Sequence, residues 1–110
     1  MKLSDLPTGV TDWADQVASS LPGASGVATV RGRQLGGVQI RLVDYSAGYE
    51  ADHWCPKGHI LFVAAGSLAI EHADGRRYEL AGGMSYHVAD DDPSPHRLTS
   101  SGGASVFIVD

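Results

Sequence analysis

Three histidines and the only cysteine of the chain are the residues whose types and spacing could do chemistry. His53, Cys55 and His59 lie close together, and His96 follows much later in the sequence. Imidazole is the commonest protein ligand for Zn, Fe, Cu and Ni, and a thiolate binds the softer members of that group. The spacing is not that of the paired cysteines in a zinc finger. We therefore predict a divalent transition metal site (Zn, Fe, Ni or Cu) formed by His53, Cys55, His59 and His96.

The same residues also allow interpretations without a metal. His53 and His59 could be hydrogen-bonded residues of a pocket, and Cys55 could be a small buried apolar side chain. A Cys55–His59 dyad is a third possibility, although the sequence identifies no further residue to orient the imidazole. Of the two other histidines, His72 beside an expected hairpin is predicted to lie at the surface, and His87 in an alternating strand is predicted to face solvent or a subunit contact.

The elements that must position these residues are short β-strands. From residue 27 onward, apolar residues alternate with polar ones, or run continuously for a few positions, between turn residues. Asp74-Gly75 between two such runs is a strong hairpin signal, because glycine tolerates the positive φ that the turn requires. The strands that we expect cover residues 27–31, 38–42, 60–65, 68–72, 77–80, 84–88, 96–99 and 106–109. Many short strands with little helix predict an all-β jelly-roll β-barrel over residues 26–110.

The first 25 residues have a different pattern. Asp12 can cap a helix, and Trp13, Val17 and Leu21 recur at spacings typical of one helical face until Pro22-Gly23 stops it. We predict that residues 1–25 form a strap or a short N-terminal helix packed on the barrel.

Composition limits the class of protein. The chain has 110 residues, enough for one domain, and 14 glycines and 5 prolines favour frequent turns. Its formal net charge of −5 argues against nucleic acid and anionic membrane surfaces as partners, and no apolar run reaches the roughly 20 residues of a membrane span. A single cysteine and the absence of a secretory leader pattern predict a cytoplasmic protein. Strands that are apolar on both faces predict a homodimer.

Two segments carry a family resemblance. The stretch from Gly48 to His59, followed by Gly66, resembles the first motif of the cupin superfamily, and Gly83–Tyr86 with Pro95-His96 resembles the second. By position, His53 and His96 match metal-binding histidines of the motifs, Cys55 stands where the second histidine would be, and His59 stands where the glutamate would be. Asp52–Cys55 and the segment 107–110 are similar to small bacterial single-domain cupins that are named for an Asp-His-Cys-Trp motif and have no assigned activity.

The resemblance, which covers roughly residues 27–110, implies a cupin-type barrel with a transition metal inside it. It implies oxygen-dependent oxidation or isomerisation of a small polar molecule, as an oxygenase or an isomerase would perform. Imidazoles from His53, His59 and His96 would leave coordination positions open, with Cys55 either a fourth ligand or close beside the metal. The alternative is a non-catalytic cupin module that binds or senses a small-molecule ligand.

Overall fold

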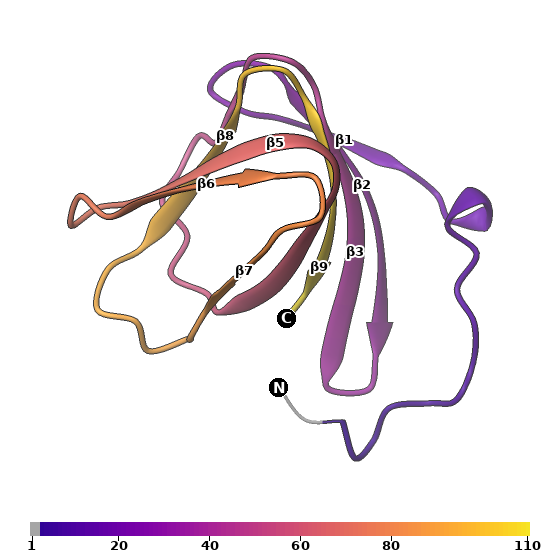
Figure 1. Cartoon of the computed structure of the whole chain (residues 1–110). Helices are drawn as coiled ribbons and strands as arrows, with labels where there is room; N and C mark the ends of the chain where they lie inside the picture. The colour runs from indigo at the N-terminus through magenta and orange to yellow at the C-terminus, as the bar shows by residue number, and fades with distance from the viewer. Residues whose placement is uncertain (1–2) are drawn as a thin grey trace.

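The computed structural model describes residues 3–110, which form two curled antiparallel sheets (Figure 1). One sheet contains β1, β2, β3, β9, the first half of β5, and β7; the other contains β4, β8, the second half of β5, and β6. The strands are β1 (Ser19–Pro22), β2 (Val27–Leu35), β3 (Val38–Tyr45), β4 (Tyr49–Glu50), β5 (His59–His72), β6 (Arg77–Ala81), β7 (Ser85–Val88), β8 (His96–Ser100) and β9 (Ala104–Val109). The prediction of an all-β jelly-roll architecture is confirmed.

Strand β5 belongs to both sheets and joins them. Its first half pairs with β7 and β9, and its second half pairs with β6 and β8. The pairing with β9 shifts register between Val63 and Ala65, and Gly66 follows with a φ of +80°. A bulge of this kind bends a strand and increases its twist. The bend lets a single strand pass from one wall of the barrel to the other.

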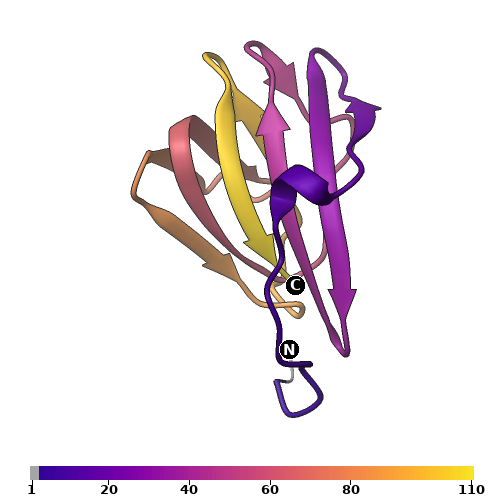
Figure 2. The same ribbon diagram turned by 90° about the vertical axis from the view of Figure 1, so that its right-hand side faces the viewer.

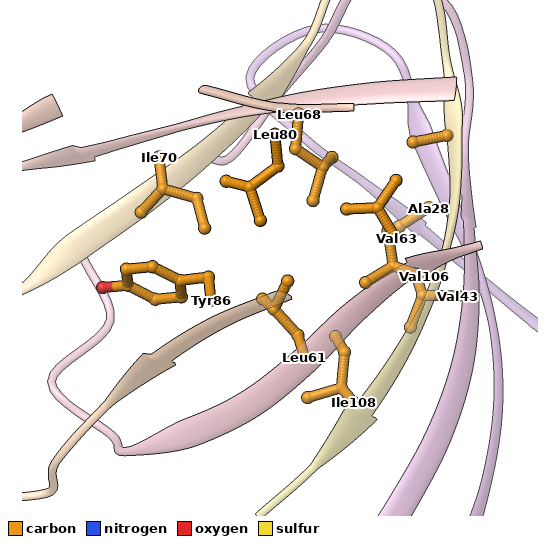
Figure 3. Packing of buried hydrophobic residues seen from close by; sticks show 11 residues of the cluster. Ala28, Val43, Leu61, Val63, Leu68, Ile70, Leu80, Tyr86, Val106 and Ile108 are labelled. Atoms are coloured by element: carbon orange, nitrogen blue, oxygen red, sulfur yellow. The ribbon is translucent and has the colours of Figure 1, made fainter. Parts of the chain in front are cut away.

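The core fills the space between the two walls, with aliphatic side chains meeting from both sides (Figure 3). Val63 and Val106 come from one sheet, and Ile70, Leu68 and Leu80 come from the other. All five side chains are at most 4% exposed. The end of the barrel that they fill is therefore packed with side chains and is not a channel. The buried histidines, His72 and His96, lie next to Tyr86 at the other end of the barrel, which we call the polar end.

The N-terminal segment is a strap and not a helix. Among residues 3–110 the only helical element is a single 3₁₀ turn, Trp13–Asp15, capped by the Asp12 side chain, which accepts a 3.0 Å hydrogen bond from the Ala14 amide. The prediction that the amphipathic pattern continues as a helix to Leu21 is wrong, because Leu21 lies in β1 and pairs with Ala28 of β2. The segment crosses the outside of the first sheet (Figure 2), where the ring of Trp13 packs edge-on against Phe107 at 6.3 Å.

Two turns fix the strand boundaries. Strand β2 runs through Gly32, where we expected it to end, because the reversal of direction takes place at Gly36, which has a φ of +59°. The Asp74-Gly75 hairpin between β5 and β6 is confirmed, with a φ of +96° at Gly75. No helix within residues 3–110 is long and apolar enough to cross a lipid bilayer.

We expect the change Gly66→Ala to destabilise the protein strongly. A Cβ atom there would overlap the carbonyl oxygen of Gly103, in addition to the strain of a positive φ. Gly48→Ala is the matched control, because Gly48 has nearly the same φ, +79°, and open space around a new Cβ. Urea unfolding followed by circular dichroism should show a loss of about 1 kcal/mol for Gly48→Ala and roughly 2–4 kcal/mol for Gly66→Ala. Equal losses of stability in the two variants would show that the Gly103 backbone can move to accommodate a Cβ atom at position 66.

Candidate metal centre

Three potential metal ligands converge at the polar end of the barrel. His59 is the first residue of β5, His96 is the first residue of β8, and Cys55 lies in the loop that precedes β5. One ligand atom from each side chain lies within 4.8 Å of the other two, and the sulfur of Cys55 is 3.5 Å from Nε2 of His59. Residues distant in sequence are therefore gathered into one cluster, which we call the Cys-His-His cluster.

Backbone pairing sets the distance between two members of this cluster. Cys55 and His96 form an isolated antiparallel bridge, in which the Cys55 amide donates to the His96 carbonyl at 2.7 Å and the His96 amide donates to the Cys55 carbonyl at 3.0 Å. The two residues are directly opposite each other, so their side chains emerge on the same side of the bridge. Backbone hydrogen bonds, and not side-chain conformation alone, therefore keep Cys55 and His96 next to each other.

Asp110 orients the third member. Its carboxylate lies 2.8 Å from Nδ1 of His59 and also accepts a 2.7 Å hydrogen bond from Arg41. A carboxylate can only accept, so Nδ1 of His59 carries the proton and Nε2 presents its lone pair toward Cys55. Sequence analysis missed Asp110, because nothing near it in the sequence signals a role and 51 positions separate it from His59. It also supplies the orienting residue that the sequence did not reveal for a Cys55–His59 pair.

The cluster favours neutral imidazoles. Burial is the main cause of a lowered pKa at His59, and the hydrogen bond that its Nδ1 donates to Asp110 only partly opposes it. Burial also lowers the pKa of His96 to about 4, with further contributions from His59 and His72. A neutral imidazole has a free lone pair, so neither ring has to lose a proton at neutral pH before it can bind a metal ion.

His53 is not brought into the cluster. The residues around it form a bend and not the extended strand that we expected, so His53 and Cys55 do not project together from one strand. The His53 side chain is 76% exposed, and its Nδ1 lies 2.6 Å from the carboxylate of Asp52. His53 does line the same cavity as Cys55, His59 and His96. Its role as a ligand remains a prediction.

The predictions for the two other histidines differ in their outcomes. His87 is exposed, as predicted, but the prediction that His72 lies at the surface is wrong. His72 is 2% exposed and pairs with His96 across β5 and β8. Its Nε2 lies 2.7 Å from the hydroxyl of Tyr86. The alternation that buries Leu68 and Ile70 on β5 also points His72 inward, and this alternation was visible in the sequence.

Two contacts hold the loop that carries Cys55. Trp54 lies on the outside of the loop, where the guanidinium of Arg97 packs 4.6 Å from its ring centroid. At the other end of the loop, the Gly58 amide donates a 2.7 Å hydrogen bond to Asp90. Two of the three carboxylates in the acidic run 90–92 therefore bind protein groups, since Asp92 also accepts a 2.8 Å hydrogen bond from Arg76.

The donor set fits a divalent transition metal. The groups are one thiol and two neutral imidazoles, one of which is oriented by a carboxylate as is usual for metal-binding histidines. Bonds of about 2.0–2.3 Å to a shared tetrahedral ion place ligand atoms roughly 3.3–3.8 Å apart. The 3.5 Å between the sulfur of Cys55 and Nε2 of His59 falls in this range, and His96 lies within 4.8 Å of both, so a small adjustment of its side chain would complete the site. Three protein ligands leave a fourth position open, as in catalytic and not structural sites.

Two cavities adjoin the cluster. The smaller, of about 160 Å³, is lined by Tyr45, Tyr49 and the cluster itself. The larger, of about 540 Å³, lies on the other side of His59 and Asp110, and its remaining polar lining includes Gln34, Gln39 and Lys57. His59 and Asp110 line this cavity, so a small molecule there would contact the site.

Comparison with solved structures identifies the architecture. Ectoine synthase from P. lautus superimposes with a TM-score of 0.72, covering 93% of this chain and 76% of that one at 19% identity. An RmlC-like cupin from Shewanella frigidimarina gives 0.70, covering 96% and 91% at 14% identity. This chain has the cupin fold. A sugar phosphate isomerase of the cupin superfamily from Silicibacter pomeroyi is also similar, with a TM-score of 0.68, coverages of 92% and 74%, and 16% identity.

These identities are low, so the cupin likeness establishes the fold and not the activity. No protein-family model matches the sequence, and comparison with curated proteins finds no match. The resemblance to the Asp-His-Cys-Trp group of cupins therefore stays a prediction.

The lowered pKa values predict that the metal-free protein loses stability as the pH falls. Below about 6.5 the unfolded chain protonates His96, whereas the folded protein resists protonation until about pH 4. The unfolded state binds more protons in this interval, so stability is complete above about pH 6.5 and declines toward pH 4. The difference in pKa corresponds to about 3 kcal/mol. His59 acts in the same direction.

Urea unfolding at several pH values, with a chelator present, measures this dependence. His96→Gln should flatten the decline between pH 6.5 and 4, whereas His87→Gln, a change at an exposed position, should leave it unchanged. If the free energy of unfolding of His96→Gln falls with pH as steeply as that of the wild type, His96 is not desolvated in the folded state.

Proposed function

We propose that this cupin-fold protein binds one divalent transition metal ion through Cys55, His59 and His96. The observation that carries the proposal is the convergence of their three ligand atoms within 4.8 Å. The hydrogen bond from Nδ1 of His59 to Asp110 supports it, because it leaves the lone pair of Nε2 free to bind the ion. A thiolate ligand would favour Zn or Cu within the predicted group of Zn, Fe, Ni and Cu.

The open coordination position defines what the site does in this proposal. A bound ion supplies Lewis-acid or oxygen-binding chemistry to a small molecule beside it. The cavity of about 540 Å³ next to His59 offers amide groups from Gln34 and Gln39 and the ammonium of Lys57, which suits a small polar molecule. We propose oxidation or isomerisation of such a molecule, and the enzymes among the cupin-fold neighbours support a catalytic role.

The competing function is a binding or sensing module without turnover. The same cavity supports it, and within residues 3–110 the cluster has no carboxylate in direct contact with Cys55 or His96 to act as a general base. The identity of the ion separates the two functions. Iron with open coordination supports the enzyme, whereas zinc with four protein ligands supports the binding module. In either case a cytoplasmic location would keep the Cys55 thiol reduced.

We also propose that a second copy of the chain covers the outer face of the first sheet. Ile60 and Phe62 on β5 are 49% and 43% exposed, and they lie beside Val109 and Phe107 of β9. No carboxylate is among these four residues or their β7 partners, Ser85 and His87, so two copies of the face can meet without repulsion between like charges. The strap contacts this face at Phe107, where the ring of Trp13 packs.

The metal proposal is tested by elemental analysis of protein purified without chelators or affinity metals. We expect about one transition metal ion per chain in the wild type, and a large loss of metal in His96→Ala and Cys55→Ser. His53→Ala is the matched control, because His53 is a neighbouring histidine outside the cluster, and it should keep its metal. Circular dichroism checks that each variant folds.

Two results would contradict this proposal. One is an absence of metal even after reconstitution with Zn, Fe, Ni and Cu salts, and the other is undiminished metal in both His96→Ala and Cys55→Ser. Loss of metal in His53→Ala would instead extend the site to His53.

The dimer proposal predicts a mass of about twice 11.5 kDa by light scattering at micromolar concentration. Phe62→Glu places a charge in the proposed interface and should give the monomer, since burying an unpaired carboxylate is costly. Tyr78→Glu is a control at another half-exposed aromatic residue on β6, outside this face, and should leave the mass unchanged. A monomeric wild type would refute the dimer.

A further inference from the structure

A third cavity lies beside His72 and Tyr86, whose rings neighbour His96 of the Cys-His-His cluster. It has a volume of about 650 Å³ and opens between β6 and β7, strands that both pair with β5 but not with each other. We call it the β6–β7 cavity. Its lining includes His72, Tyr78, Leu80, Met84, Tyr86 and Val88. None of these belongs to the cluster, and the volume is within the usual range for small-molecule sites.

The wall of the β6–β7 cavity is rich in aromatic rings. Tyr78 and Tyr86 have ring centroids 5.8 Å apart, and Tyr78 meets His72 edge-on at 5.9 Å. Met84, 47% exposed, adds a flexible thioether, which makes favourable contacts with aromatic rings. Rings and a thioether around one opening favour a flat aromatic ligand.

One polar group in this wall is buried and built into a network. The Tyr86 hydroxyl points away from the aliphatic core (Figure 3) and lies 2.7 Å from Nε2 of His72. Nδ1 of His72 lies 3.1 Å from the Ser94 carbonyl, which can only accept a hydrogen bond, and 3.2 Å from the Arg76 guanidinium, which can only donate one. Because Arg76 already has Asp74 and Asp92 as acceptors, we assign the proton to Nδ1, and the Tyr86 hydroxyl then donates to Nε2. Burial raises the pKa of Tyr86 to about 12, so the hydroxyl stays protonated. Its oxygen retains the capacity to accept a hydrogen bond from a ligand.

The charged residues of the cavity leave no free cation for an anionic ligand. The guanidinium of Arg76, 3.2 Å from Nδ1 of His72, donates to Asp74 and Asp92 at 2.9 and 2.8 Å. Arg77 lies 3.5 Å from Glu79. The lining therefore contains two cations and two anions, Glu79 and Asp92, in paired positions. Electrostatics do not favour a carboxylate or a phosphate here.

We propose that the β6–β7 cavity is a second binding site, separate from the metal site, for a neutral aromatic molecule that bears a hydroxyl group. The ring of the ligand lies against Tyr78, Met84 and Leu80, and its hydroxyl donates to the oxygen of Tyr86. This site requires no metal, so it stands or falls independently of the metal proposal.

The probe is 2-naphthol, added to metal-free protein and to protein incubated with Zn²⁺, with 2-naphthoate as the charged analogue of the same ring system. Binding is followed by titration of the Met84 methyl signal in ¹H–¹³C NMR spectra. We expect saturable binding of 2-naphthol in both samples and at least tenfold weaker binding of 2-naphthoate. Tyr86→Phe should weaken binding of 2-naphthol by about tenfold, equivalent to one hydrogen bond. Tyr78→Phe, which keeps the ring and removes a hydroxyl with no assigned bond, should change it by less than twofold.

A second variant covers the case in which Tyr86→Phe does not fold, since that change leaves Nε2 of His72 without its partner. Met84→Trp fills the opening from a half-exposed position and should abolish the binding. The inference is overturned if 2-naphthol causes no saturable shift, if 2-naphthoate binds as well, or if Met84→Trp binds normally. It is also overturned if a folded Tyr86→Phe binds as tightly as the wild type.

Discussion

The structure depends on one strand that is a member of two sheets. Because β5 pairs with β7 and β9 at its start and with β6 and β8 at its end, it closes the barrel that the other strands line. It also carries His59 at one end and His72 at the other. The bend near Gly66 brings both histidines to the same polar end of the barrel, on either side of His96. Without the bend, the cavity beside His59 and the β6–β7 cavity beside His72 would not lie at the same end of the barrel.

Desolvation explains why the histidines at this end suit ligand binding. Burial lowers the pKa of His59 and of His96 and so disfavours their charged forms. Asp110 fixes the orientation of His59, and Tyr86 fixes that of His72. His96 is held by its backbone pairing with Cys55 and by contact with rings on both sides. A row of three imidazole rings therefore separates the metal cluster from the β6–β7 cavity. This division gives the polar end of one small barrel two chemically different compartments.

The fold was predictable from sequence because its signals are local. Alternation in 38–42 and 68–72, the Asp74-Gly75 turn, and the glycines of the cupin motifs each act over a few residues. The helix expected up to Leu21 failed because its apolar spacing also suits a strand edge, and pairing with Ala28 decided the outcome. Such a tertiary contact overrides weak helix propensity and leaves no local trace.

The site was predictable in part. His59, Cys55 and His96 were recognisable by residue type and motif position, whereas the exclusion of His53 depends on a bend at 52–53 that spacing does not encode. Asp110 could not be found, because its role exists only once β9 lies between β3 and β5. The surface position predicted for His72 was wrong. Its strand pattern points inward, and its place next to a hairpin does not expose it.

The bridge between Cys55 and His96 has a consequence for unfolding. These residues bracket a stretch of chain that contains β5, β6 and β7, and a metal ion held by both would act as a cross-link closing that loop. Closure of a long loop removes conformational entropy from the unfolded chain. The loaded protein would therefore be more stable than the metal-free protein, so metal availability would set how much of the chain is folded.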